Sequence, residues 1–84
     1  MGQCWTQHEC AETSLHVLVG MSAAEARARA SAWPDVAAVE SYLPSDLAEM
    51  SFRFGRVRLY LTQDFKVRRA SYENMRGSAI YTGQ

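Results

Sequence analysis

Arginines recur at alternate positions directly after a stretch of chain that has no helical pattern. Arg56 and Arg58 alternate with apolar residues through residues 56–61, which predicts a strand with both arginines on one face. Residues 44–52 before it predict a long loop that carries Glu49 and Ser51. Guanidinium groups can hold loop backbone by fork-like hydrogen bonds, and a long loop in a small domain is more often functional than idle. The arginines and the loop are therefore the candidate functional site.

A second set of reactive side chains lies near the amino terminus, where Cys4, His8, Cys10 and His16 are all residue types that bind zinc. Their spacing matches no familiar zinc-binding pattern, so the sequence favours unrelated side chains on an unstructured arm and predicts no metal site. Cys4 and Cys10 are either free or joined to each other, the second in an oxidising compartment.

Enzyme chemistry finds little support in the sequence. A covalent mechanism needs a nucleophile, a base and an orienting group within reach of one another. The two histidines lie in or just after the amino-terminal arm, and no acidic pair forms a known motif. No glycine-rich phosphate loop is present. We therefore expect a protein that is not an enzyme and uses no cofactor.

Length and charge predict one small soluble domain. The chain has 84 residues, and its nine basic and nine acidic residues give a formal net charge of zero. This balance predicts no general attraction to nucleic acid or to an anionic membrane. No apolar run approaches the length of a membrane span, and the amino terminus lacks an apolar signal region. We expect a monomer that is either cytoplasmic or the mature form of a secreted protein.

One helix with a clear start should support the strands. Ser22 followed three residues later by Glu25 predicts an N-cap with a capping box. Residues 23–33 are rich in alanine, the best helix former, and Pro34 should stop the helix. Before the helix, the short apolar run at residues 15–20 should pack beneath it.

Extended segments follow the helix at residues 36–43, 53–62 and 66–70, with the loop at 44–52 and a turn at 63–65. A parallel pairing of the first two strands would need a wide, stretched connection, because parallel crossovers usually take a dozen or more residues. The sequence thus predicts an α+β domain at residues 15–72, with one helix on a small mixed sheet. Residues 1–14 should be a flexible arm and residues 73–84 a polar tail.

The core predicted from the helix and strand periods is small. Its members are the apolar residues that these periods turn inward, namely Leu18, Ala26, Ala30, Val39, Val57, Leu59 and Leu61. Trp33 should partly cover this core.

Three motifs occur in an order that is known from one family. They are Val19-Gly20-x-Ser22-x-x-Glu25-Ala26, Leu43-Pro44 and Met50-Ser51-Phe52-Arg53-Phe54-Gly55-Arg56-Val57-Arg58-Leu59. Between residues 18 and 70 the chain resembles the potato inhibitor I family of serine protease inhibitors, to which barley chymotrypsin inhibitor belongs. The Leu18-Val19-Gly20 run preceded by Cys10 is also similar to a related group of small bacterial and fungal elastase inhibitors.

The resemblance implies a long exposed reactive-site loop that enters the active site of a subtilisin-like or chymotrypsin-like protease as a substrate would. It implies a reactive loop at Glu49, Met50, Ser51 and Phe52, with the scissile bond near Met50-Ser51. It also implies that Arg56 and Arg58 support the loop from below.

The chain departs from the family pattern at three places. The loop is one residue shorter between Pro44 and Arg53, so Glu49 or Ser51 could instead precede the scissile bond. Glu49 lies before this bond, whereas the family has its acidic residue after it. Cys10 has no partner near the carboxyl terminus to form the disulfide of the elastase inhibitors. The alternative function is a non-inhibitory protein-binding module with the same fold.

Overall fold

The computed structural model describes residues 9–47, 51–74 and 76–83. Its helical elements precede all of its strands along the chain. They are α1 (Ala11–Ser14), the 3-10 helix η1 (Leu15–Leu18) and α2 (Ala23–Ser31). The strands are β1 (Ala38–Tyr42), β2 (Arg56–Leu61), β3 (Val67–Glu73) and β4 (Ala79–Gly83). None of the described helices is long and apolar enough to cross a membrane.

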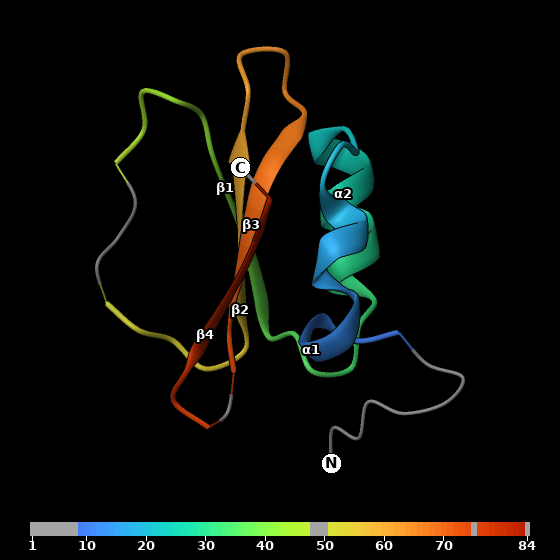
Figure 1. The fold of residues 1–84 in the computed structure, drawn as a ribbon, viewed down its shortest axis with the longest axis vertical. Coiled ribbons are helices and arrows are strands. Elements are labelled where there is room, and N and C mark those ends of the chain that lie inside the picture. Colours follow the sequence, from blue (N-terminus) through green and yellow to red (C-terminus); the bar gives the residue numbers. More distant parts are fainter. Residues whose placement is uncertain (1–8, 48–50, 75, 84) are drawn as a thin grey trace.

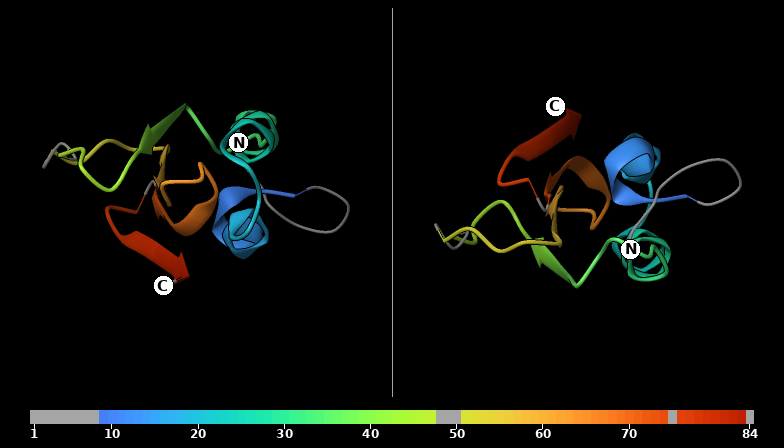
Figure 2. Two further views of the ribbon diagram at one scale, coloured as in Figure 1. Left: turned by 90° about the horizontal axis from the view of Figure 1, so that it is seen from above. Right: turned by 90° about the horizontal axis from the view of Figure 1, so that it is seen from below.

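The four strands form one mixed sheet in the order β1-β2-β3-β4. Strands β1 and β2 are parallel, and β3 is antiparallel to both β2 and β4. The helices cover one face of this sheet, and the described parts of the connection between β1 and β2 project on the opposite side (Figures 1 and 2). The fold is therefore a small α+β domain with a helical layer and a sheet layer, as the sequence predicts.

Helix α2 begins where the capping box predicts. The backbone N–H of Glu25 donates to Oγ of Ser22 over 3.2 Å, and the Ser22 hydroxyl donates to the Glu25 carboxylate over 3.3 Å. The helix ends at Ser31, two residues before the predicted end at Trp33. The first of these bonds satisfies a backbone donor that the first turn of a helix would otherwise leave open, and the second holds the Ser22 and Glu25 side chains together.

The core lies between the helical layer and the sheet, and its prediction is largely confirmed. The predicted members that are buried are Leu18, Ala26, Ala30, Val57, Leu59 and Leu61. Val39 is only half-buried and packs against the core, whereas Trp33 is fully part of it at 4 % exposure. The core also contains five residues that the predicted list did not include, namely Ala11, Leu15, Val67, Ala70 and Tyr72.

The prediction of a loose arm is wrong from residue 9 onward. Ala11 is completely buried and opens α1, and the backbone N–H groups of Ala11 and Glu12 donate to the Asp35 carboxylate over 2.8 and 3.1 Å. Asp35 comes from the segment after α2, so it caps α1 across the molecule. A cap from a distant residue leaves no local signal in the sequence, which explains the error. Residues 1–8 lie outside the described residues.

The prediction of a polar tail from residue 73 is also wrong, because β3 continues to Glu73 and β4 follows. Asn74 makes the turn between them: its Oδ1 accepts from the backbone N–H groups of Arg76 and Ser78, each over 3.0 Å. Gly77 supplies the positive φ of 85° that the turn requires. The turn residues Asn74 and Gly77 were the signals that the sequence reading missed.

Candidate functional site

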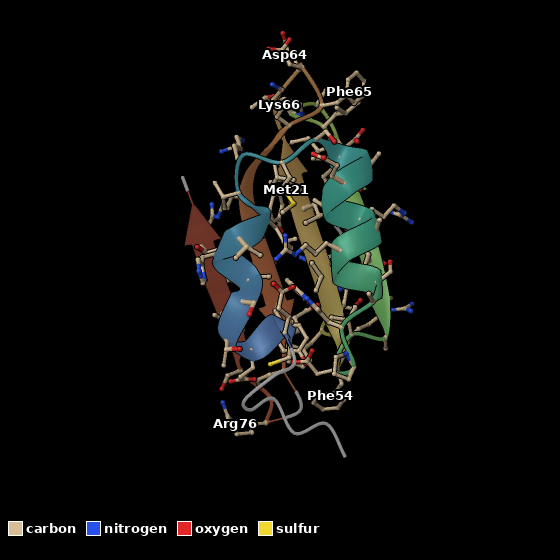
Figure 3. The ribbon with its side chains drawn as sticks, turned by 90° about the vertical axis from the view of Figure 1, so that its right-hand side faces the viewer. Met21, Phe54, Asp64, Phe65, Lys66 and Arg76 are labelled. Atoms are coloured by element: carbon tan, nitrogen blue, oxygen red, sulfur yellow. The ribbon has the colours of Figure 1, made fainter. Side chains whose placement is uncertain are left out.

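The loop between β1 and β2 starts and ends at opposite ends of the domain. It begins next to the turn that contains Phe65, since Leu43, Pro44 and Phe65 line one open depression. It ends beside Phe54, and Figure 3 shows Phe54 and Phe65 at the two ends of the molecule. The two described parts of the loop therefore lie toward opposite ends of the sheet, on the side away from the helices (Figure 1).

A small turn shapes the beginning of the loop. The backbone N–H of Leu43 donates to Oδ2 of Asp46 over 2.8 Å, and the N–H of Asp46 donates back to the carbonyl of Leu43 over 2.9 Å. Beyond this turn, Leu47 is 95 % exposed. An apolar side chain that exposed gains nothing from the core of this chain.

Two of the four residues predicted for the reactive loop can be placed. Ser51 and Phe52 are exposed, and the Phe52 ring contacts that of Phe54 edge to face, with 5.3 Å between the ring centroids. Glu49 and Met50 lie outside the described residues. The segment that follows the predicted scissile bond is thus on the surface, and it has its own aromatic contact.

Both arginines that were predicted to support the loop donate hydrogen bonds to the same acceptor, the carbonyl oxygen of Ser51. Nη2 of Arg58 donates to this oxygen over 3.1 Å, and Nη2 of Arg56 donates to it as well. In both bonds the acceptor is the main chain and not the Ser51 side chain. Two charge-assisted donors on one carbonyl fix the backbone beside the predicted scissile bond.

Arg56 is held by a buried carboxylate that the sequence reading did not include. Arg56 is 0 % exposed, and its Nε and Nη2 donate to Oε1 and Oε2 of Glu73 over 2.5 and 2.9 Å. Glu40 adds a second carboxylate, 3.6 Å from Nη1 of Arg56. The Arg56 side chain is therefore a fixed support that connects β2, β3, β1 and the loop.

The ionisation of this pair follows from its contacts. The hydrogen bond to Glu73 raises the pKa of Arg56 above its usual value, although burial opposes this. Burial alone raises the pKa of Glu73, but the hydrogen bond and the charge of Arg56 outweigh it, so that pKa lies below the usual carboxyl value. Both groups are charged at neutral pH, which is the state that the bidentate contact needs.

Gly55 fixes the end of the loop between two strands. Its N–H donates to the carbonyl of Glu73 over 2.7 Å, and its carbonyl accepts from the N–H of Ala37 over 2.7 Å. Its φ is 80°, and a Cβ at this position would lie 3.1 Å from the Cβ of Ala37. A side chain would therefore be both strained and crowded here, so glycine suits this junction.

Tyrosines border the support on the β1 side. The rings of Tyr42 and Tyr60 stack with 5.5 Å between centroids, and the Arg58 guanidinium lies 6.0 Å from the Tyr42 centroid. The Tyr42 hydroxyl contacts the Glu40 carboxylate. Burial and this contact raise the pKa of Tyr42 to about 12, so its hydroxyl stays protonated and can donate.

Glu73, Glu40 and Gly55 are the site residues that sequence reasoning missed. Glu73 was assigned to the tail, although β3 places it directly opposite Arg56 in the sheet register. This contact could have been predicted only by extending the third strand three residues beyond its predicted end at Ala70. The strand pairing, rather than any local motif, identifies this partner.

The sequence predicted no metal site, and the structure describes only some of the residues on which that prediction was based. Among the described residues, no group of three or more His, Cys, Asp or Glu side chains could hold a metal ion. Cys10 is buried, with its Sγ 3.3 Å from Oγ1 of Thr13, and His16 is exposed. Cys4 and His8 lie outside the described residues, as does any contact between Cys4 and Cys10.

Comparison with known proteins adds no identification: no family model, no curated protein and no solved structure matches this chain.

Proposed function

We propose that this protein inhibits serine endopeptidases by presenting residues 44–55 as a substrate-like loop. The observation that carries the proposal is the contact of Arg56 and Arg58 with the Ser51 carbonyl, directly after the predicted scissile bond. The motifs that resemble the potato inhibitor I family support the same function. So does the small mixed sheet with helices packed on one face, because the family that the chain resembles is expected to pack a helix on such a sheet.

Slow and reversible cleavage follows from holding the segment after the scissile bond. When the protease serine attacks the Met50 carbonyl, an acyl-enzyme forms and the amine of Ser51 is the leaving group. Two arginines keep Ser51 in place, so this amine stays close to the acyl group. A nucleophile held at such a high effective concentration reverses the acylation before water can complete hydrolysis.

Rigidity in the support gives the loop its affinity. The guanidinium of Arg56 is fixed by both oxygens of Glu73, and Gly55 is hydrogen-bonded to β3 and to the segment before β1. A loop held in its bound conformation loses little freedom on association, so more of the contact energy appears as binding.

Met50 would fill an apolar specificity pocket, which favours chymotrypsin-like and subtilisin-like proteases.

The experiment is a titration of subtilisin, chymotrypsin and trypsin with the purified protein. We expect subtilisin or chymotrypsin to lose activity in proportion to the inhibitor added, with slow cleavage after Met50 by mass spectrometry. Met50→Lys should weaken this inhibition and improve that of trypsin, because an unpaired cation is costly in an apolar pocket. Phe65→Lys is the matched control, because Phe65 is an exposed residue outside the loop. Rapid, complete cleavage with no inhibition of any of the three enzymes contradicts the proposal.

The second candidate is a non-inhibitory protein-binding module with the same fold. Its support is the apolar exposure along the loop, where Leu47 is 95 %, Phe52 43 % and Phe54 57 % exposed. Such side chains suit a protein interface whether or not a peptide bond is cut. Stable binding to a protein without loss of a protease activity, abolished by Leu47→Asp, would favour this candidate.

A further inference from the structure

Arginine and tyrosine side chains contact one another in a row across the outer face of the sheet, the face opposite the helices. We call this set the Arg–Tyr row, and its members are Tyr42 on β1, Arg58 and Tyr60 on β2, Arg69 on β3 and Tyr81 on β4. Arg58 lies over the Tyr42 ring, Tyr42 stacks on Tyr60, and Arg69 lies over both Tyr60 and Tyr81. The row therefore crosses all four strands as one series of ring and cation contacts.

Arg69 is the member of the row that is best placed to bind a ligand. Its guanidinium carbon lies 5.8 Å from the Tyr60 centroid and 5.4 Å from the Tyr81 centroid. Arg69 is exposed, and Tyr81 is 60 % exposed. Contacts with two rings restrain the side chain while its N–H groups remain available, and a guanidinium edge matches the two oxygens of a carboxylate.

The charges of the outer face leave Arg69 without compensation in the described part of the chain. Among the described residues, the carboxylates on this face are Glu40 and Glu73, and both face Arg56. None of the described ion pairs includes Arg69. A carboxylate from another molecule would therefore meet a preoriented cation that has no acidic partner here.

The position of the row relates it to the loop. Arg58 belongs to both, since it contacts Tyr42 and donates to the Ser51 carbonyl. The described loop segments project beside β1 and β2, whereas β4 lies at the far edge of the sheet (Figure 2). A protein that covers the loop could thus reach Arg69 and Tyr81 on the same side of the domain.

We propose that Tyr60, Arg69 and Tyr81 form a second contact site for the protein that binds the loop, and that this site takes an Asp- or Glu-bearing segment of that protein. The proposal rests on the proposed function for its partner. The chemistry of the site stands on the Arg–Tyr row alone. Tyrosine and arginine are also among the residues enriched where protein interfaces gain most of their binding energy.

A peptide segment fits this surface better than a nucleic acid. Single-stranded nucleic acids need open aromatic faces and a cationic groove along their backbone. Here the Tyr42 and Tyr60 rings stack on each other, and the chain has a formal net charge of zero. One oriented guanidinium between two tyrosines suits a carboxylate side chain instead.

The first test uses an octa-glutamate peptide, with an octa-glutamine peptide of equal length as its neutral counterpart. In two-dimensional NMR, the glutamate peptide should shift the backbone amides of Tyr60, Arg69 and Tyr81, and 0.5 M salt should weaken the effect. Arg69→Gln should bind it about fivefold more weakly, the upper range for an exposed ion pair. Arg27→Gln is the matched control, because it removes the same charge from α2 on the opposite side of the sheet.

Several results would overturn the site. They are no shift with the glutamate peptide, equal binding of the glutamine peptide, or an equal loss of binding in Arg27→Gln. Tighter, Arg69-dependent binding of a twelve-residue oligothymidine would replace the protein partner with nucleic acid.

A second test separates this site from the proposed function. For any protease that the parent protein inhibits, Arg69→Gln should slow association about fivefold at low salt, whereas Arg27→Gln should not. Unchanged association would overturn the second contact and leave inhibition standing. If no protease is inhibited but the glutamate peptide binds at Arg69, the proposed function fails and the carboxylate site stands.

Discussion

The two faces of β2 are buried by different means, and neighbouring residues show the contrast. Val57 and Arg56 are both 0 % exposed, but Val57 packs into the apolar core beneath the helices while Arg56 meets Glu73, Glu40 and the Ser51 carbonyl. Apolar burial is non-directional and follows the area removed from water. A buried ion pair is directional, and its attraction has to offset the cost of removing two charges from water.

The contrast explains how one strand can serve both the fold and the loop. The apolar face contributes stability that tolerates small shifts in packing. The charged face contributes little net stability, but it fixes the position of the Ser51 carbonyl. Changes on the two faces should therefore have different effects on stability and on cleavage of the loop.

The largest effect on stability should come from breaking the buried pair. Arg56→Ala leaves the Glu73 carboxylate buried without its main partner, which should lower the free energy of unfolding by about 3–5 kcal/mol in urea denaturation. The double variant Arg56→Met/Glu73→Leu removes both charges and should recover most of this loss. If the double variant is as unstable as Arg56→Ala, the pair contributes packing and not only compensated charge.

On the apolar face, Leu59→Ala should cost about 2–5 kcal/mol, since Leu59 is completely buried and its removal leaves a cavity. Leu59→Met keeps the volume and should cost less than about 1.5 kcal/mol. The free energy of unfolding of both variants measures this difference. An unchanged denaturation midpoint in Leu59→Ala would show that the apolar face does not stabilise the sheet.

Acid should weaken the charged face selectively. The pKa of Glu73 is lowered in the folded protein, so its contribution is fully present above the unfolded-state carboxyl pKa of about 4.3 and is lost as the pH falls through the folded value. The unfolding free energy of the parent should therefore drop between pH 7 and pH 3. Arg56→Met/Glu73→Leu should lose less over this range, and an equal loss in both proteins would assign the acid sensitivity to other carboxyls.

Arg58→Ala should affect the loop far more than the fold. Arg58 is only half-buried, so the free energy of unfolding should fall by about 1 kcal/mol or less. Loss of its bond to the Ser51 carbonyl should still speed cleavage between residues 44 and 55 by subtilisin, followed by mass spectrometry. Arg68→Ala on β3 is the control, and similar cleavage rates in all three proteins would argue against bracing by Arg58.

The smallest effect concerns a contact on the helical side. Glu9 accepts hydrogen bonds from Arg29 and from the Trp33 indole, and the bonds to Arg29 and Trp33 lower its pKa to about 2. The indole N–H signal of Trp33 should therefore shift in NMR only as the pH approaches 2. In Glu9→Gln this transition should disappear, and a midpoint near 4 in the parent would show that the contact does not persist in solution.

Local sequence chemistry determined the central part of the fold. The start of α2 follows from Ser22 and Glu25, and the inward residues of β2 follow from alternation, because both signals lie within a few neighbouring positions. The same alternation placed Arg56 and Arg58 together on the other face of β2. Fold class and most of the core were therefore predictable.

The rest depended on contacts between residues far apart in the chain. Nothing near Ala11 indicates that Asp35 caps α1, and nothing near Arg56 indicates that Glu73 lies opposite it. A solvated arginine and a buried one also look alike in a strand pattern, because alternation gives the face but not what covers it. Only the tertiary structure decided that Arg56 is a buried support, since its partners come from β1, β3 and the loop and meet only when the sheet has formed.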